Sequence, residues 1–271
     1  ALRRARGALL RSRAGRARCV SAVLAIARRE CRAAFASPLA WTLLAGSCGL
    51  AAWWLLLAVD GWSQNAAAIA ARPDAPGVTD LVVAPHLASV CALLVAIVPL
   101  LTMRSICGER RDGTLPLLFS AGAGDGQIVL GKFLGAFAIA LLLVALLVAM
   151  PLLLAIGTPL DFGRIAVAAL GLALLAGALV AIGVLASSIA HHPATAALGA
   201  LGAGALLWIV DAAARARGDV NGLVNWLAIP SHLTAALRGV LASVDVAYFV
   251  LLAAFCLVLA ARFVARTRED G

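Results

Sequence analysis

FLGAFAIALLLVALLVAMPLLLAI, residues 133–156, is the stretch of sequence that decides the fold. It contains no charged residue, and a helix that crosses the hydrocarbon core of a bilayer needs about 20 mostly apolar residues. The whole chain shares this bias, because 63% of its 271 residues are apolar and only 13% are charged. Soluble domains average roughly 45–50% apolar and about 25% charged residues. We therefore predict an all-α, polytopic membrane protein.

Five further windows have the length and composition of a membrane span. Two of them are separated only by the turn at His191, His192 and Pro193, and proline cannot continue a helix, so we expect a tight helical hairpin there. The sequence thus predicts six transmembrane helices, at about 39–59, 81–103, 133–156, 164–190, 194–210 and 245–263.

The distribution of basic residues predicts the orientation, since an even number of spans leaves both termini on the same side. With both termini in the cytoplasm, 17 of the 22 Lys and Arg residues lie inside and five lie outside, as the positive-inside rule requires. The inner surface then carries a net charge of +11 and the outer surface −2, which together account for the formal net charge of +9. Topology explains the basic excess, so no nucleic-acid partner is expected.

The interiors of the predicted spans contain no Asp, Glu, Lys or Arg, apart from residues at their ends such as Arg164 and Asp245. Charges at the bilayer centre usually mark proton relays, ion paths or voltage sensors, so ion-coupled transport and voltage sensing are not expected. The six cysteines form no C-x-x-C pair, and no metal site or disulfide framework is predicted. The spans contain no catalytic constellation either.

Small residues recur at every fourth position of the span at 164–190. This spacing places them on one helix face and lets helix backbones approach closely. Two interpretations stand side by side: general packing in an alanine-rich chain, or a dedicated subunit interface. The strip consists of Ala169, Ala173, Gly177 and Ala181.

The segment before the first span divides into two parts. Residues 1–18 contain seven arginines and no acid, which favours a disordered basic arm on an anionic membrane surface over a transit peptide. Residues 19–37 carry apolar side chains at helical spacing with arginines on the flank, which predicts an amphipathic interfacial helix. That helix is either a lipid anchor or an elbow that receives a partner. Its apolar stripe is Val20, Val23, Leu24, Ala27, Cys31, Ala34 and Phe35.

The loop between the second and third spans, residues 104–132, is the most elaborate on the predicted inner face. A charge cluster at 109–112 is followed by Gly113 and Thr114, which can end one helix and cap the next. Residues 115–119 then form a short apolar helix. The segment GQIVLGK at 126–132 imitates a phosphate-binding loop, but Phe133 replaces its Ser or Thr, so the chain has no ATPase of its own.

Three segments resemble, in order, the permease subunit of an ABC-2 type ABC transporter. They are ARRECRAAFASP at 27–38, GERRDGT at 108–114 followed by QIVLGK at 127–132, and IGVLASS at 182–188. A further pair, SHLTAALRG at 231–239 and DVAYF at 245–249, is similar to the gliding-motility branch, whose relatives include the permeases of nitrous-oxide-reductase maturation. The resemblance covers about residues 20–265.

The resemblance implies a permease domain over 38–265 in the bacterial inner membrane, with a cytoplasmic tail at 266–271. Such a permease pairs with a second copy or a homologous permease, binds two copies of a cytoplasmic ABC ATPase and sometimes an auxiliary periplasmic or membrane subunit. ATP and Mg belong to the ATPase, and the permease itself binds no cofactor. We expect an exporter that works by alternating access.

Specific residues are carried over from the family by position. In the family, two elements contact the ATPase: the elbow and the loop after the second span, which is residues 104–132 here. An outer gate lies before the last span. The outer gate region would contain Trp226, Ser231, His232 and Arg238, on short helices at Leu223–Ala228 and Ser231–Arg238. The coupling interface would contain Glu109, with Arg110, Arg111, Asp112, Gly113, Thr114, Arg28, Arg29 and Glu30 around it.

The segment GAGDG at 122–126 departs from the family, which usually has bulkier residues there, and predicts a more flexible joint. A competing function is a membrane scaffold that anchors an ATPase without moving a solute. A substrate-dependent ATPase rate or a continuous cavity between protomers would favour transport over the scaffold.

Overall fold

The computed structural model describes residues 20–71, 76–120, 122–216 and 226–269. These ranges form helices, turns and short connections, without any strand. Six of the helices are long and apolar enough to cross a membrane. The predicted class, an all-α polytopic membrane protein, is confirmed.

The helices follow the predicted order along the chain. Residues 20–36 are helical, and a single extended residue, Ser37, precedes α2. The next elements are α2 (Pro38–Ala70), the π-helix η1 (Thr79–Val83), α3 (Ala84–Thr102), α4 (Cys107–Arg111) and α5 (Leu115–Ser120). They continue with α6 (Asp125–Leu152), the 3-10 turn η2 (Leu153–Ile156), α7 (Phe162–Ile189), α8 (Pro193–Ala216), α10 (Ile229–Leu237) and α11 (Ser243–Glu269).

Helix α6 extends beyond its predicted window at the N-terminal side. It begins at Asp125, because extended Gly124 donates its amide to the Gln127 side chain and accepts the Gln127 amide, at 3.1 and 2.9 Å. Lys132 therefore lies inside a continuous helix, about two turns from its start at roughly 3.6 residues per turn.

Helix α7 is the centre of the bundle and packs against α3, α6, α8, α10 and α11. Leu172, Leu175 and Leu179, spaced three and four apart, are all buried and join the main apolar core. A Cβ at Gly183 would lie only 1.9 Å from Thr102 Oγ1 of α3. Glycine at this position lets the Thr102 side chain of α3 lie directly against the backbone of α7.

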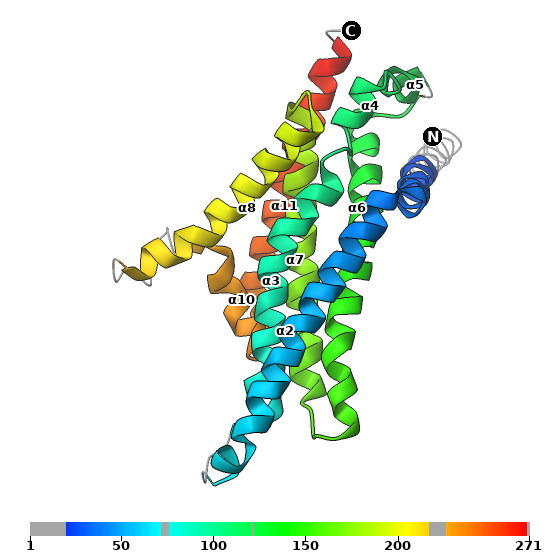
Figure 1. Ribbon diagram of the computed structural model, residues 1–271. Coiled ribbons are helices and arrows are strands. Elements are labelled where there is room, and N and C mark those ends of the chain that lie inside the picture. The colour runs from blue at the N-terminus through cyan, green and yellow to red at the C-terminus, as the bar shows by residue number, and fades with distance from the viewer. Residues whose placement is uncertain (1–19, 72–75, 121, 217–225, 270–271) are drawn as a thin grey trace, which may run out of the picture.

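The elements predicted to contact a partner share one end of the bundle. Figure 1 shows α4 and α5, the helix of residues 20–36 and the last turns of α11 at the same end, whereas the α6–α7 connection lies at the opposite end. Helix α8 starts beside α7 and diverges from the other long helices toward its own end (Figure 1). We call the first of these ends the α4–α5 end.

Candidate functional site

The helix of residues 20–36 docks on α6 through a G-x-x-x-G pair. A Cβ at Gly131 would lie 2.7 Å from the Ile26 Cβ, and one at Gly135 would lie 2.5 Å from the Glu30 Cβ. Contacts this short leave no room for a side chain, so only glycine permits the approach. Glu30 therefore lies on the face of the helix that contacts α6, whereas other residues of this helix, such as Arg28, are exposed.

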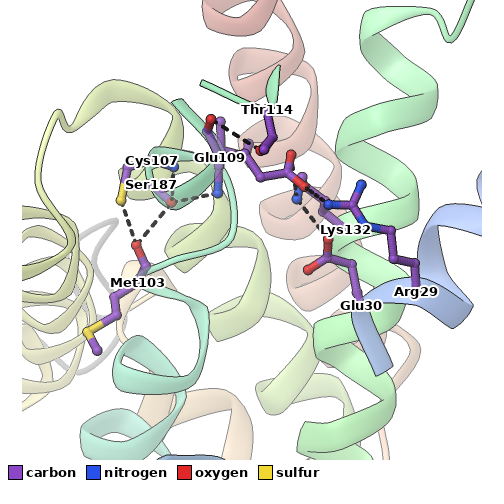
Figure 2. A network of polar contacts seen from close by, with 9 residues as sticks. Arg29, Glu30, Met103, Cys107, Glu109, Thr114, Lys132 and Ser187 are labelled. Atoms are coloured by element: carbon purple, nitrogen blue, oxygen red, sulfur yellow. Dashed lines mark hydrogen bonds and ion pairs between the residues drawn. The ribbon is translucent and has the colours of Figure 1, made fainter. Parts of the chain in front are cut away.

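A buried ammonium group lies directly beside this contact. The Lys132 side chain is 1% exposed, and its Nζ lies 2.8 Å from Glu30 Oε1 and 3.0 Å from Glu109 Oε2. Arg29 Nη2 donates to Glu109 Oε1 at 3.0 Å. Figure 2 shows the four side chains converging from the helix of residues 20–36, from α4 and from α6. We call these four residues, Arg29, Glu30, Glu109 and Lys132, the ion cluster.

The ion cluster contains two acids and two bases, and its burial is graded. The side-chain exposures are 54% for Arg29, 24% for Glu30 and 11% for Glu109. Removing one partner of a buried ion pair typically costs about 3–5 kcal/mol, because a charge is left without compensation. Lys132 has two compensating carboxylates on two different elements, so its burial depends on both elements staying in place.

The backbone around Glu109 is fixed by the turn that ends α4. Gly113 has φ of 68°, its amide donates to Arg110 O at 3.4 Å, and the Thr114 amide donates to Glu109 O at 3.0 Å. This is the Schellman arrangement, in which a left-handed glycine lets the chain satisfy the last carbonyls of a helix. The sequence predicted that Gly113 and Thr114 end one helix and start the next, and α5 follows at Leu115.

Ser187 of α7 holds the other end of α4. Its buried hydroxyl accepts from the amides of Ile106 and Cys107 at 2.9 and 3.1 Å, and it donates to Met103 O at 3.2 Å (Figure 2). These amides open α4 and have no partner within the helix. One hydroxyl therefore ties the turn after α3 and the start of α4 to the central helix.

Arg110 points into the bundle. Its Nη2 donates to Ser188 O at 3.0 Å and to Thr267 Oγ1 at 2.9 Å, which joins the end of α7 to the end of α11. A cation at the last carbonyls of a helix also interacts favourably with the helix dipole. Its neighbours Arg111, Asp112 and Gly113 are exposed.

The structure thus divides the residues predicted for the coupling interface into two groups. Glu109, Arg29 and Glu30 meet in the ion cluster, and Arg110 binds α7 and α11. Arg28, Arg111, Asp112 and Gly113 are exposed at the α4–α5 end, and Thr114 is partly buried behind them.

Sequence reasoning assigned no role to Lys132 or Ser187. Lys132 was treated as the end of a false phosphate-binding motif. The signal that could have revealed it is a lysine within an apolar helix, which needs acidic partners nearby. Ser187 gave no such signal, because a serine at the end of a span has many possible partners.

The predicted gate residues Trp226 and His232 lie together in one aromatic cluster at α10. His232 Nδ1 lies 2.7 Å from Asp245 Oδ1, and its Nε2 lies 2.8 Å from Trp226 O. The ring stacks on Tyr248 with 4.1 Å between centroids. Ser231 Oγ donates to Ala228 O at 2.7 Å.

Arg238 is exposed and closes α10 as its C-terminal cap. Residues 223–225 of the helix predicted at Leu223–Ala228 lie outside the described residues, and of the other three 226 and 227 are helical. The helix predicted at Ser231–Arg238 corresponds to α10, which starts two residues earlier.

The small-residue strip of α7 runs from the surface into the bundle. Ala169 and Ala173 are partly buried, whereas Gly177 and Ala181 are buried. A Cβ at Gly177 would lie 3.3 Å from the Phe137 ring of α6, so this part of the strip packs within the chain. Among the described residues, no group of three His, Cys, Asp or Glu side chains could hold a metal ion.

The arrangement can transmit force between elements. Lys132 connects α4 with α6 and with the helix of residues 20–36. Ser187 and Arg110 connect the same region with α7 and α11. A family model described as ABC-2 family transporter protein matches residues 24–270, which includes all of these elements except the first four residues of the helix of residues 20–36. A search among curated proteins finds no match to the chain.

Proposed function

The chain belongs to the ABC-2 transporter family and is a permease component that works with an ABC ATPase subunit; from this premise we propose that it exports its substrate by alternating access. The proposed cycle begins when two copies of the ATPase, which hold ATP and Mg, close on the α4–α5 end. The long helices then tilt as rigid bodies and switch the side of the membrane to which the substrate path opens.

The observation that carries this proposal is the ion cluster. Glu109 lies on a five-residue helix at the end of the bundle, and its carboxylate contacts Arg29 and Lys132 on two other elements. Interactions among buried charges are strong in a low-dielectric setting, so the three elements move together. A displacement of α4 by an ATPase would therefore be transmitted to α6 through the contact between Glu109 and Lys132.

The exposed residues at the same end support ATPase docking. Arg28, Arg111 and Asp112 are exposed, and none of their side chains has a hydrogen-bond or ion-pair partner among the described residues. Charges of both signs on a protruding turn favour a specific polar contact with a partner surface. We assign docking to these residues and transmission to the ion cluster.

The remaining parts of the proposal follow the family. The permease pairs with a second copy or a homologous permease in the bacterial inner membrane, with both termini in the cytoplasm. The helix of residues 20–36, α4, α5 and the end of α11 lie at one end of the bundle, which agrees with that orientation (Figure 1). The segments at 231–239 and 245–249 support a place in the gliding-motility branch.

The test is a neutral substitution in the ion cluster. Glu109→Gln keeps the size of the side chain but removes the charge that pairs with Arg29 and Lys132. We expect the ATPase complex to form, while transport-coupled ATPase activity in proteoliposomes falls about tenfold, because loss of one charge-assisted interaction is worth roughly 1.5–3 kcal/mol.

Asp60→Asn at the exposed far end of α2 is the matched control and should leave the ATPase rate unchanged, because Gln64 of the same helix is the only partner of its carboxylate among the described residues. Coupled activity in Glu109→Gln equal to that of the wild type would remove Glu109 from the proposed mechanism. An ATPase rate that responds to no substrate in the wild type would favour the scaffold function instead.

A further inference from the structure

A pocket of about 310 Å³ lies beside the ion cluster, between the helix of residues 20–36, the start of α2, the end of α3, α4 and α6. Its volume is at the lower end of the range for small-ligand sites, which is about 300–1,000 Å³. Lys132 and Glu109 form one wall. Arg29 and Glu30 of the ion cluster and Asp112 also line the pocket, and the remaining lining residues have no part in the proposed coupling.

The wall formed by α3 and α4 has an ordered chemistry. Leu100 at the end of α3, Arg104 in the turn at 103–106, Gly108 in α4 and Asp112 after α4 line the pocket in this order along the chain. Along that line the lining changes from an apolar side chain to a cation and then to an anion.

The floor of the pocket is apolar and extends toward the membrane interior. On α6, Ala136 and Ile139 lie four and seven residues beyond Lys132, which corresponds to roughly 6 and 10 Å along the helix. Leu39 of α2 and Leu101 of α3 complete this floor. An alkyl chain buries favourably against such a surface, whereas a polar segment of a soluble protein does not.

Aromatic side chains indicate the depth of the pocket in the bilayer. Trp41 follows Ala40, which lines the pocket. Trp41 is 54% exposed, and the centroid of its ring lies 5.8 Å from that of Phe35. Exposed tryptophans concentrate at the level of the lipid headgroups. The mouth of the pocket therefore lies where phospholipid phosphates are found.

The charges of the pocket leave one cation available for a ligand. Lys132 is compensated by Glu30 and Glu109. Arg104 is exposed and has no hydrogen-bond or ion-pair partner among the described residues. Its position, one turn beyond Leu100, places the guanidinium at the boundary between the apolar floor and the polar mouth.

We propose that this pocket binds a glycerophospholipid of the adjacent leaflet. Arg104 holds the phosphate, because a guanidinium forms charge-assisted hydrogen bonds with phosphate oxygens. The first acyl carbons lie over Leu100, Leu101 and Ile139. The unpaired Asp112 carboxylate at the mouth receives an amine when the headgroup carries one. The inference requires only the membrane and does not depend on the export function.

The experiment is native mass spectrometry of the purified full-length permease, without ATPase, in detergent containing phosphatidylethanolamine or phosphatidylglycerol. The wild type should retain one phospholipid. Arg104→Gln should bind it about tenfold more weakly, because one charge-assisted contact is lost. Ala136→Leu fills the floor without changing charge and should reduce retention to a similar extent. Arg32→Gln, an exposed arginine that does not line the pocket, is the control and should retain lipid like the wild type.

The comparison of lipids identifies the recognised group. Equal retention of both lipids indicates the phosphate alone, and a preference for phosphatidylethanolamine that disappears in Asp112→Asn adds the amine; both results support the proposal. Unchanged retention in Arg104→Gln and Ala136→Leu would overturn it. So would glycerophosphate binding as tightly as a phospholipid.

Discussion

Burying the Lys132 ammonium group costs several kcal/mol of hydration, and its neighbours offset this cost in a way that selects one arrangement of the chain. Glu30 and Glu109 are far from Lys132 in the sequence, yet both carboxylates lie within 3.0 Å of its Nζ. Rotating either helix would leave a charge without a partner. The specificity of the ion cluster therefore comes from individual atoms and not from the net charge of the surface.

Ser187 acts at the same scale through hydrogen bonds. Ser187→Ala removes the acceptor of the Ile106 and Cys107 amides, and each unsatisfied buried group costs about 1–3 kcal/mol. We expect the amides of residues 106 and 107 to exchange hydrogen faster with solvent in a hydrogen-exchange measurement.

The neighbouring Ser188→Ala is the matched control, because within the part of the chain that the structure describes the Ser188 hydroxyl bonds only to Leu185 O of its own helix. Its exchange pattern over 103–107 should match that of the wild type. Equal protection in Ser187→Ala would show that the hydroxyl does not hold α4.

At the scale of the element, the helix of residues 20–36 uses its two faces differently. Val23, Ile26 and Ala27 are buried against the rest of the chain, whereas Val20 and Leu24 of the predicted stripe are 58% and 47% exposed. The docked face therefore differs from the predicted stripe, because the contact with α6 passes through Ile26 and Glu30. One face binds protein and its neighbour faces the membrane interface.

Cys31 reports on this docking. Burial raises the pKa of its thiol above the usual range, the Glu30 carboxylate adds to the rise, and Sγ lies 3.5 Å from Gly135 O. Only the thiolate reacts, so alkylation of Cys31 at neutral pH should be slow. The alkylation rate should begin to rise at a higher pH than it does for a free cysteine. Gly135→Ala separates the helices, so Cys31 should react several-fold faster at neutral pH.

The measurement is maleimide labelling of a variant in which the other cysteines are replaced by serine. Gly126→Ala is the control on the same helix, since a Cβ at Gly126 meets nothing within 4 Å. Identical labelling rates in Gly135→Ala and Gly126→Ala would contradict the close contact of the two helices.

At the scale of the whole molecule, α7 determines how the bundle moves. It contacts α3, α4, α6, α8, α10 and α11. Near its end the Ser187 hydroxyl accepts from two amides at the start of α4, and the Ser188 carbonyl accepts from Arg110. Helix α8 contacts α7 and α3 and then diverges from them (Figure 1). A displacement at the α4–α5 end therefore passes through the helix that has the most neighbours.

Gly183→Ala tests this central packing. The new methyl group would lie 1.9 Å from Thr102 Oγ1, so α3 and α7 must separate. Overpacking of this kind typically costs about 1–3 kcal/mol. We expect a lower unfolding temperature in detergent than for the wild type.

Gly202→Ala on α8 meets nothing within 4 Å and serves as the control, with an unfolding temperature at or slightly above that of the wild type. A Gly183→Ala protein as stable as this control would mean that the Thr102 side chain of α3 does not lie directly against the backbone of α7 at Gly183.

The sequence predicts most of the fold because its signals are local. Apolar length identified all six long helices, and the proline after His192 placed the start of α8 at Pro193. Gly113 ends α4 as its backbone freedom suggested. The candidate site was found in part: Glu109 was chosen for its loop, but its partner Lys132 was not, because the start of α6 lies seven residues earlier than Lys132.

Apolar periodicity, helix-ending residues and charge asymmetry were by themselves sufficient to determine an all-α membrane protein with six long helices and an elaborate loop after the second. Only the tertiary structure decided that Lys132 is buried between Glu30 and Glu109, that Arg110 turns inward, and that Ser187 holds α4. The physical reason is that helix formation depends on neighbours along the chain. Pairing between helices depends on their rotation and register, which small steric differences at residues such as Gly131 and Gly135 decide.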